Sequence, residues 1–436
     1  RREKRQLKRR DMNILLIGSG GREHAIANAL AKSPRLKQLF ISPGNPGPAQ
    51  VGANVSLDNS DHDAVRQFCQ DRAIELVVIG PEQPLIDGLS DALVKAGIAV
   101  FGPSQAAAQL EGSKGFTKDL CRDNHIPTAD YAAFDNEKDA QAYLRTKSAP
   151  IVVKADGVAA GKGVVVAMTL EEAQQAVSAM FAGAFGAAGA QIVVEEFLSG
   201  EEASFFAICD GTRAHPFATA QDHKRVGDGD TGPNTGGMGA YSPASIISSA
   251  LSQQVMDEII YPTLKAMQAR GAPFSGILYA GLMLTQQGPK LIEYNVRFGD
   301  PEAQAILPRL EDDLATLMFD CARGNLPIDP PQFTQNKTLT VVMAAQNYPD
   351  KPITGTQIHK LEEAEKLSDI IITHAGTRLE HGQLVAAGGR VLNITASAPT
   401  ICEAQQKAYA AAQKINWREG FYRHDIGWRE VLREKV

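Results

Sequence analysis

The sequence predicts an α/β protein with an N-terminal parallel sheet and a small β-rich C-terminal domain. In the N-terminal part, short apolar runs alternate with helical stretches, and strands that alternate with helices form parallel sheets. After about residue 330, strand-like runs instead follow one another with few helices between them. The 436 residues are enough for about two to four domains.

Four short apolar runs give the strands of the first domain, which we place at residues 12–111. The runs are 13–17, 38–41, 74–79 and 98–101. Ligands of parallel sheets bind beyond the carboxyl ends of the strands, so we expect the loops that follow these strands to share one rim. Those loops contain Gly18, Pro43, Glu82 and Pro103.

The first of these loops, Gly18-Ser19-Gly20-Gly21, leads into a helix that runs to about residue 31. Bare backbone amides at a helix N-terminus favour a bound anion. The turn is Rossmann-like but departs from the dinucleotide fingerprint, which needs glycine where Glu23 stands and an acid after the second strand. NAD is therefore not expected. A phosphate on a smaller ligand and a tight turn without a ligand both remain open.

A glycine-rich hairpin at 150–166 follows a charged helical segment. Lys154 lies inside an apolar strand of this hairpin, where a buried lysine needs an anionic partner. The loop is not a Walker A loop, because only three residues separate Gly157 from Gly161. Lysines beside a flexible glycine loop suit a mobile lid that closes over phosphates. A glycine hairpin with surface lysines is the plainer alternative.

A strand at 191–198 is followed, after a short linker, by a second strand that begins near Glu201. This arrangement indicates a hinge between two sheets, and such a crevice takes a flat base between apolar side chains. Glu202 is then placed to accept hydrogen bonds from ribose hydroxyls. An acidic surface turn is the alternative.

The stretch 221–241 is predicted to be a long loop of low regularity. Loops of this length are functional or disordered, and the alternation of glycine with charged residues favours an active-site loop. An EF-hand interpretation of Asp228-Gly229-Asp230 fails, because no Glu stands at the twelfth position. His223 alone does not predict a metal site.

The most informative stretch is the strand at 291–298, which runs into a tight turn at Gly299-Asp300. Alternate side chains of a strand share a face, so Glu293, Asn295 and Arg297 point the same way. A carboxylate, an amide oxygen and a guanidinium side by side suit a metal-bound polyphosphate. A chance polar face on an exposed strand is the alternative.

The C-terminal part, about 331–436, is predicted to be β-rich. Its last two strands, 383–387 and 390–394, are expected to form a hairpin with a Gly388-Gly389 turn. A helix from about 400 to 415 follows.

Composition excludes a membrane protein and a disulfide or zinc scaffold. No run approaches about eighteen uninterrupted apolar residues, so we expect no membrane span. The five cysteines are odd in number and contain no CxxC pair, which indicates a reducing, cytoplasmic setting. They are Cys69, Cys121, Cys209, Cys321 and Cys402.

The first eleven residues, RREKRQLKRRD, differ from the rest of the chain. They hold seven basic and two acidic residues, whereas the whole chain has a formal net charge of −6. The remainder is therefore acidic, which disfavours nucleic-acid binding. The leader lacks the apolar core of a secretory signal. We interpret it as upstream sequence outside the fold, since Met12 directly opens a strand; a basic arm for nucleic acid or an anionic surface is the alternative.

Taken in order, these motifs resemble the ATP-grasp superfamily and, within it, the phosphoribosylamine–glycine ligase family of purine biosynthesis. The resemblance covers essentially all of residues 12–436, and the motifs are far more specific together than singly. They are Gly18 to His24, Gly80 to Leu85, Lys154 to Gly163, Gln221 to Arg225, Asn234 to Gly239, Arg297 to Glu302 and Ala387 to Val391.

The resemblance implies a three-domain enzyme. A substrate-binding domain at 12–111 would precede an ATP-grasp domain at 112–330, with its lid at about 130–197, and a C-terminal domain at 331–436. The implied substrates are ATP, glycine and 5-phosphoribosylamine. The implied products are ADP, phosphate and glycinamide ribonucleotide, formed through glycyl phosphate.

The resemblance also implies which residues hold the metal and the nucleotide. Glu293 and Asn295 are expected to hold Mg²⁺, with Mn²⁺ as the alternative. Leucines and a methionine at 282–284 stand where a further acidic ligand is often found, so the number of metal ions stays open. The nucleotide residues would be Lys114 and Lys154 at the phosphates, Glu195 and Leu198 at the adenine, and Glu202 at the ribose.

The remaining implied roles concern the reaction and the other substrates. Arg297 would clamp the transferring phosphoryl group or the glycyl carboxylate, and the implied catalytic set is Arg297, Asp300 and Lys154. Contacts to glycine and the ribosylamine would come from Gly20, Gly21, Glu82, Asp222 and Asp300.

As partners the resemblance implies small molecules only, with no nucleic acid and no membrane, for a cytoplasmic monomer or weak dimer. A sister ligase for another carboxylate or amine would lack the Asp222-His223-Lys224 motif. A non-catalytic nucleotide sensor would be expected to have lost Glu293, Asn295 or Arg297.

Overall fold

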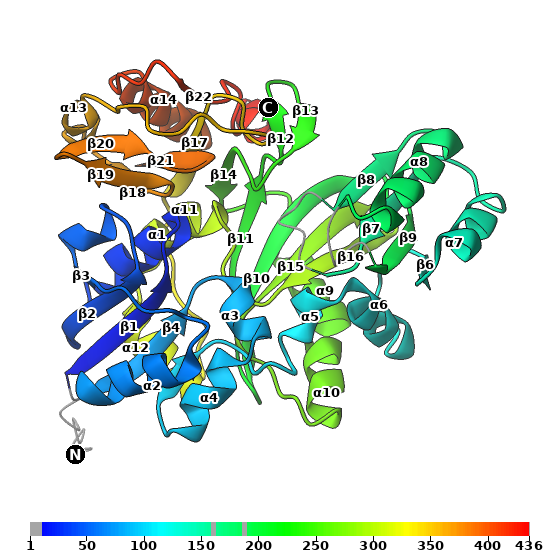
Figure 1. Ribbon diagram of the computed structural model, residues 1–436, viewed down its shortest axis with the longest axis horizontal. Coiled ribbons are helices and arrows are strands. Elements are labelled where there is room, and N and C mark those ends of the chain that lie inside the picture. Colours follow the sequence, from blue (N-terminus) through cyan, green and yellow to red (C-terminus); the bar gives the residue numbers. More distant parts are fainter. Residues whose placement is uncertain (1–10, 158–162, 185–189, 436) are drawn as a thin grey trace.

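The computed structural model describes residues 11–157, 163–184 and 190–435. The first ten residues of the basic leader and the tip of the glycine-rich hairpin, with Gly161 and Lys162, therefore lie outside the described residues. Figure 1 shows three regions, an N-terminal one in blue, a C-terminal one in orange and red, and a green central sheet beside a small teal sheet.

The N-terminal region is a parallel sheet, as the sequence predicted, and its five strands lie in the order β3-β2-β1-β4-β5. Its central strand is buried along its whole length, because both faces of the sheet are covered. The strands are β1 (Met12–Gly18), β2 (Leu36–Pro43), β3 (Ala53–Asn54), β4 (Ile74–Ile79) and β5 (Ala99–Phe101). The helices are α1 (Gly21–Leu30), α2 (His62–Asp71), α3 (Glu82–Ile86) and α4 (Leu89–Lys95), with a 3₁₀ turn at Pro48–Gln50.

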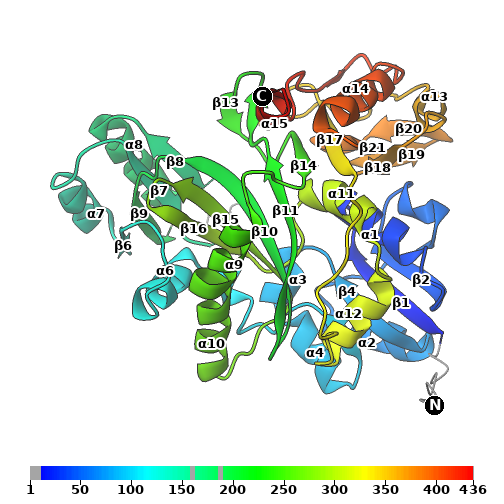
Figure 2. The ribbon, with the colours of Figure 1, turned by 180° about the vertical axis from the view of Figure 1, so that it is seen from behind.

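A segment far along the chain returns to this region. Helix α12 (Leu314–Ala322) packs against β5 and α1, and its buried Leu317 and Met318 belong to the same apolar cluster as Ile14 and Leu16 of β1. Figure 2 shows α12 beside the N-terminal sheet. The N-terminal core is thus completed by residues about 300 positions away, because one face of its sheet needs an apolar cover.

The central sheet is antiparallel, and in the described part of the chain it continues into the C-terminal region. Its order is β16-β15-β10-β11-β14-β17-β21-β18, with β22 also paired to β17. Strand β14 makes the connection, pairing with β11 on one side and β17 on the other. The strands are β10 (Glu201–Asp210), β11 (Ala214–Asp222), β14 (Gly239–Ser242), β15 (Ser275–Thr285), β16 (Gly288–Asn295), β17 (Lys337–Ala345), β18 (Ile370–His374), β21 (Arg390–Ala398) and β22 (Gly420–Phe421).

Helices cover both parts of this sheet. Figure 2 shows α9 and α10 in front of β10 and β15. In the C-terminal region α14 packs on β17 and β21 through its buried alanines. The remaining helices are α9 (Ser249–Val255), a π-helical turn (Met256–Ile260), α10 (Tyr261–Ala269), α11 (Glu302–Ile306), a 3₁₀ turn (Leu307–Arg309), α13 (Leu361–Glu365), α14 (Ile401–Ala412) and α15 (Trp428–Arg433).

A separate four-stranded sheet in the order β6-β9-β7-β8 carries the glycine-rich hairpin. Two helices, α7 and α8, pack on it around a small apolar core, and Thr169 and Glu172 form a capping box at the start of α8. The elements are β6 (Tyr131–Phe134), α7 (Glu137–Leu144), β7 (Ile151–Ala155), β8 (Val164–Ala167), α8 (Leu170–Phe181) and β9 (Ile192–Glu196). Helices α5 (Gln109–Gly112) and α6 (Lys114–Asp123) lead into it from the N-terminal region.

Two expectations about local structure are wrong. The stretch 221–241 is not an irregular loop, because β12 (Arg225–Gly227) and β13 (Thr231–Asn234) pair within it. The turn between them has positive φ at Gly229 (67°) and Asp230 (57°), as a tight hairpin turn requires. Likewise the polar strand ends at Asn295, so Arg297 stands in the turn that follows it.

The expected hairpin around Gly388-Gly389 is also wrong. Strand β20 (Gln383–Ala386) pairs with β19 (Thr377–Glu380), whereas β21 pairs with β17 and β18. Gly376 lies between the two expected partners: it accepts from the amide of Ala387 and donates to the carbonyl of Arg390. The two glycines serve close packing, since a Cβ on Gly376 would lie 2.7 Å from the Cα of Gly388.

Candidate active site

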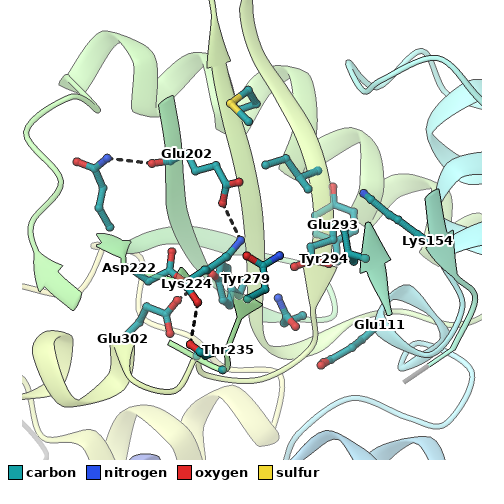
Figure 3. A pocket seen from close by; sticks show the side chains of 18 of the residues that line it. Glu111, Lys154, Glu202, Asp222, Lys224, Thr235, Tyr279, Glu293, Tyr294 and Glu302 are labelled. Atoms are coloured by element: carbon teal, nitrogen blue, oxygen red, sulfur yellow. Dashed lines mark hydrogen bonds and ion pairs between the residues drawn. The ribbon is translucent and has the colours of Figure 1, made fainter. Parts of the chain in front are cut away.

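A large pocket of about 900 Å³ lies where the N-terminal region, the small sheet, the central sheet and the C-terminal region meet. It is lined by charged side chains from segments that are far apart in the sequence, and Figure 3 shows the part around β10, β15 and β16. Most of the residues that the sequence singled out line it. These are Glu82, Lys114, Lys154, Glu195, Leu198, Glu202, Asp222, Glu293, Asn295, Arg297 and Asp300.

Two buried lysines share one carboxylate at the small-sheet end of the pocket. Lys154 Nζ lies 2.9 Å and Lys118 Nζ 3.1 Å from the same oxygen of Glu195, and all three side chains are at most 5% exposed. Glu195 is therefore the anionic partner that Lys154 was expected to need. The cluster has a net positive charge, and burial lowers the pKa of Lys118 although Glu195 opposes this. Such a cluster suits an anionic ligand.

The third lysine, Lys114, begins α6 and is held at the root of the glycine-rich hairpin. Its Nζ donates to the carbonyl of Gly157 over 2.9 Å. The carboxylate of Asp156 accepts from the Lys114 and Gly115 amides and from the Ser113 hydroxyl. This cap ties the hairpin to the start of the helix, so the described base of the hairpin is fixed at the pocket.

The segment between β9 and β10 joins the small sheet to the central sheet, as the sequence indicated. Leu198 is buried in this segment and lines the pocket. Glu202, at the start of β10, forms an ion pair with Lys224 over 2.7 Å. The crevice therefore offers an apolar wall beside a paired carboxylate.

Glu293 and Asn295 line the pocket from β16, and the hydroxyl of the buried Tyr294 between them is hydrogen-bonded to Thr263. Burial raises the pKa of Glu293, but Lys224, Lys154, Lys114 and Arg297 together outweigh it, so the pKa is lowered and the group is ionised at neutral pH. No described residue donates a hydrogen bond to this carboxylate.

The two oxygens of Glu293 and Asn295 fit a hard divalent cation. Among the described residues no cluster of three acidic, His or Cys side chains could hold a metal by itself. A carboxylate and an amide oxygen facing lysines instead match the pattern in which Mg²⁺ keeps one or two protein ligands and takes the rest from phosphates and water.

Arg297 is held by two carboxylates from the N-terminal side of the pocket. Its Nη2 lies 2.7 Å from Glu111 and its Nε 3.2 Å from Glu82. The other oxygen of Glu111 accepts from the amide of Val296. Burial acts to lower the pKa of Arg297, but the charges of Glu111 and Glu82 outweigh burial and the net pKa is raised. This guanidinium therefore keeps its charge.

Asp300 connects the turn after β16 to the start of α1 and to β21. Its carboxylate accepts from Gln304 and the Arg22 amide and lies 3.5 Å from Arg390. A Cβ on Gly20 would lie 3.2 Å from Asp300, so glycine permits this approach. Gly20 and Gly21 stand beside Asp300 but do not themselves line the pocket.

The glycine turn before α1 has one of its amides already occupied. The Gly20 amide donates to Glu23 over 2.7 Å, and Arg22 pairs with Glu23 over 2.6 Å. The Glu23 carboxylate thus stands at the helix start, where a bound phosphate would otherwise lie. This geometry favours the tight turn without a phosphate.

The Asp222 carboxyl group faces the pocket at the end of β11. Burial raises its pKa to about 7; the charge of Lys224 opposes this, and the nearby Glu302 and Glu202 reinforce it. Glu302 is itself held by Tyr279, whose hydroxyl donates over 2.9 Å. Figure 3 shows Asp222 and Glu302 on the same wall of the pocket.

Three models of one family match the chain in order. The N domain of phosphoribosylglycinamide synthetase matches residues 12–111, its ATP-grasp (A) domain matches 112–303, and its C domain matches 338–429. The chain belongs to the phosphoribosylglycinamide synthetase family. It is thus a ligase of purine biosynthesis that forms a carbon–nitrogen bond and carries an ATP-grasp domain.

Individual relatives agree with this membership. The phosphoribosylamine–glycine ligase of Brucella melitensis biotype 1 is 58% identical, over 98% of this chain and 100% of the relative. That of Escherichia coli O6:H1 is 52% identical, over 97% and 100%. The crystal structure of phosphoribosylamine–glycine ligase from Thermotoga maritima has a TM-score of 0.83 at 32% identity, over 95% and 100% of the two chains.

More distant structures share the fold alone. A biotin carboxylase from Campylobacter jejuni, solved with an ATP analogue, has a TM-score of 0.71 at 13% identity, over 94% of this chain and 93% of that one. ATP-grasp enzymes use ATP and a divalent metal ion. No helix among the described residues is long and apolar enough to cross a membrane.

Sequence reasoning missed several residues of this phosphoribosylglycinamide synthetase site. Glu111 and Lys118 are two of them: they lie on α5 and α6, which the extended Ser113 separates, so helical spacing does not predict that both reach the pocket. Asp156, Arg390 and Tyr279 likewise carried no sequence signal. Arg390 donates to the carbonyls of Gly236 and Asp300, residues 154 and 90 positions away, and only the fold brings them together.

Proposed function

We propose that this chain joins glycine to 5-phosphoribosylamine at the expense of ATP, through glycyl phosphate, and releases ADP, phosphate and glycinamide ribonucleotide. One observation carries the proposal: a single pocket contains Glu293, Asn295 and Arg297 opposite Lys114 and Lys154. A carboxylate is a poor electrophile, so the enzyme must first attach a phosphoryl group to glycine. Two oxygen ligands for a metal ion, placed opposite cationic side chains, are suited to the transfer of a phosphoryl group.

ATP lies with its phosphates toward Lys114 and Lys154 and its adenine in the crevice at Glu195 and Leu198. The apolar wall at Leu198 packs on the base, and Glu202 accepts from the ribose hydroxyls. Glu202 is paired with Lys224 in this structure, so the ribose shares this carboxylate with the lysine.

Glu293 and Asn295 hold the divalent ion, which we take to be Mg²⁺ with Mn²⁺ as the alternative. When bound, this ion neutralises charge on the phosphoryl oxygens. The lowered pKa of Glu293 supports the assignment, because a ligand must be ionised and this carboxylate has no competing hydrogen bond from the described residues.

In the first step an oxygen of the glycine carboxylate attacks the γ-phosphorus and ADP leaves. Negative charge spreads over the phosphoryl oxygens, and Arg297, Lys154 and Lys114 stabilise it. The nucleophile is already an anion, so this step needs no general base. Arg297 turns toward the phosphoryl group from its contacts with Glu82 and Glu111.

In the second step the ribosylamine nitrogen displaces phosphate from the glycyl carbonyl. Glu82, Asp222 and Asp300 contact glycine and the amine, and Gly20 and Gly21 allow the amine substrate to approach Asp300. The lid at about 130–197 closes over the acyl phosphate and keeps water away from it.

The activity test is ADP release with glycine and phosphoribosylamine present, each then omitted in turn. Turnover is expected to require both. Turnover that ignores both, or that requires a different carboxylate, would contradict the assignment and would favour a sister ligase; no turnover with ATP bound would favour a nucleotide sensor.

We also place the enzyme in the cytoplasm as a monomer or weak dimer. All five cysteines are free and four of them are buried, which suits a reducing compartment. Light scattering over a tenfold range of protein concentration tests the oligomeric state; a constant dimer mass throughout would contradict it.

A further inference from the structure

The second step of the proposed reaction leaves a proton to be removed. The amine nitrogen gains a positive charge as it bonds to the glycyl carbon, and it must lose a proton before the amide is stable. A carboxylate that lines the pocket and is free of other partners is the natural acceptor.

Nearly every carboxyl group that lines the described pocket is already engaged. Glu82 and Glu111 hold Arg297, Glu195 holds two lysines, and Asp300 accepts from Gln304. Glu302 accepts from the Tyr279 hydroxyl. Those near the C-terminal region pair with arginines or lysines in the same way.

Two carboxylates remain. Among the described residues neither Glu293 nor Asp222 accepts a hydrogen bond or forms an ion pair. Glu293 is on β16, where it serves the metal. We propose, on the basis of the proposed function, that the Asp222 carboxylate takes the proton that the ribosylamine nitrogen loses as the amide bond forms.

Asp222 is held firmly in position although its carboxylate is free. Its backbone pairs with Ala240 of β14 at the end of β11. Charged and titratable groups face it from its own chain segment and from three other elements: His223 and Lys224 on its own segment, Glu202 on β10, Tyr279 on β15 and Glu302 on α11. It thus lies near Glu202 at the start of β10, where the ribose of ATP is assigned, and near Glu302, which follows the turn at Asp300.

The surroundings of Asp222 match the task. Burial, reinforced by the charges of Glu302 and Glu202 and opposed by that of Lys224, raises its pKa to about 7. A base whose pKa lies near the working pH both accepts a proton readily and releases it after the reaction.

The step balances as follows. The nitrogen lone pair forms the N–C bond, the bond between the carbonyl carbon and the phosphate oxygen breaks, and inorganic phosphate leaves with that electron pair. One proton passes from nitrogen to a carboxylate oxygen of Asp222. Solvent takes it when the product departs.

The variant Asp222→Asn separates this role from substrate binding, because it keeps the size and removes the base. In rapid-quench experiments with all three substrates, we expect ADP formation in the first turnover within about threefold of the parent. Glycinamide ribonucleotide formation is expected to fall by about 10²–10⁴-fold. Hydroxylamine in the quench traps accumulated glycyl phosphate as the hydroxamate, which is expected to increase.

Two outcomes would overturn the proposal. If ADP formation falls in proportion to product, Asp222 acts in binding or phosphoryl transfer; if product formation is unchanged, it has no role. The exposed Asp63→Asn is the matched control and is expected to change neither rate. Absence of product in the parent enzyme would instead contradict the proposed function.

A second variant changes the pKa of Asp222 without replacing Asp222 itself. Glu302→Gln keeps an acceptor for Tyr279 and removes the negative charge that helps to raise the pKa of Asp222. The acid limb of kcat is therefore expected to move to lower pH, by about half a unit to one unit, with kcat at high pH retained within about threefold. An unmoved limb would contradict Asp222 as the titrating group.

Discussion

At the residue scale, charges in the pocket are arranged in groups that share partners. Glu195 serves two lysines, and Arg297 is shared by Glu82 and Glu111. A buried charge that loses its partner is costly, whereas a charge left free on the pocket wall is available to a ligand. Replacing a side chain that pairs with another protein charge is therefore expected to lower stability. Replacing a side chain that is free to bind a ligand is expected to lower activity and leave stability nearly unchanged.

Glu293→Ala is expected to reduce ADP formation by at least about 10²-fold with little change in thermal unfolding, because in the proposed assignment the carboxylate binds the metal ion and it accepts from no described protein donor. Steady-state assays over a range of Mg²⁺ concentrations check this, alongside a melting curve. Activity retained at saturating Mg²⁺ would contradict the metal assignment.

Glu195→Gln is expected to destabilise the protein by about 3–5 kcal/mol, because two buried ammonium groups lose their shared counter-charge. Urea unfolding measures the difference. The neighbouring Glu196→Gln is the matched control. That side chain is half exposed and its ion pair with Lys290 is long, at 3.8 Å, so a change in stability within about 0.5 kcal/mol is expected. Equal effects in the two variants would contradict the shared-carboxylate geometry.

At the element scale, the C-terminal segment braces the wall of the pocket. Arg423, which is 1% exposed, pairs with Asp230 over 3.0 Å and donates to the Arg225 carbonyl. The Gly427 amide donates to His223 Nε2 over 2.8 Å. Residues about 200 positions later in the chain thus hold the β12–β13 hairpin in place by hydrogen bonds and ion pairs. The hairpin follows Asp222 and forms part of the same wall of the pocket.

Arg423→Met is expected to cost about 3–5 kcal/mol of stability, because Asp425 and the Arg225 carbonyl lose a buried donor. It is also expected to raise the KM for substrates as the hairpin loosens. Urea unfolding and steady-state kinetics are the measurements. Arg378→Met, in the exposed β19–β20 hairpin, is the control and should change neither; a silent Arg423 variant would show that the brace is dispensable.

At the scale of the whole molecule, a pair of buried histidines joins the N-terminal region to the C-terminal one. The His374 amide donates to His24 Nδ1 over 2.8 Å, across the contact of α1 with β18. Burial, together with the charge of His374, lowers the pKa of His24 to about 3, and burial lowers that of His374 to about 4.

These pKa values predict acid sensitivity of the contact. In the unfolded chain both histidines take up protons near pH 6.5, whereas in the folded protein they stay neutral until about pH 4 to 3. Their contribution is therefore complete above pH 6.5 and is lost as the pH falls below it, by about 1.4 kcal/mol per unit for each.

The variant His24→Asn keeps an acceptor for the His374 amide and removes one titrating group. The free energy of unfolding, measured in urea from pH 7 to 5, is expected to fall less steeply than in the parent, with a difference in slope that approaches about 1.4 kcal/mol per unit below pH 6.5. His381→Asn, an exposed site, is the control with an unchanged slope. An unchanged slope in His24→Asn would contradict the inference.

The local patterns of the sequence were sufficient for much of the site. The alternation that set Glu293 and Asn295 on one face is a property of any strand, and Lys154 in an apolar run required a counter-charge wherever that run folded. Family motifs added the domain order. The hairpin expected at Gly388-Gly389 was wrong because Gly376, remote in sequence, takes the backbone partners that the turn would have used.

What the sequence determined by itself is thus the class of fold, the family and the polar face of β16 that lines the pocket. The tertiary structure alone decided which charges meet: Glu111 and Glu82 at Arg297, Arg390 at Asp300, and Arg423 at Asp230. The reason is physical, since backbone periodicity acts over a few residues, whereas the strength of a charge depends on burial and on partners that any part of the chain supplies.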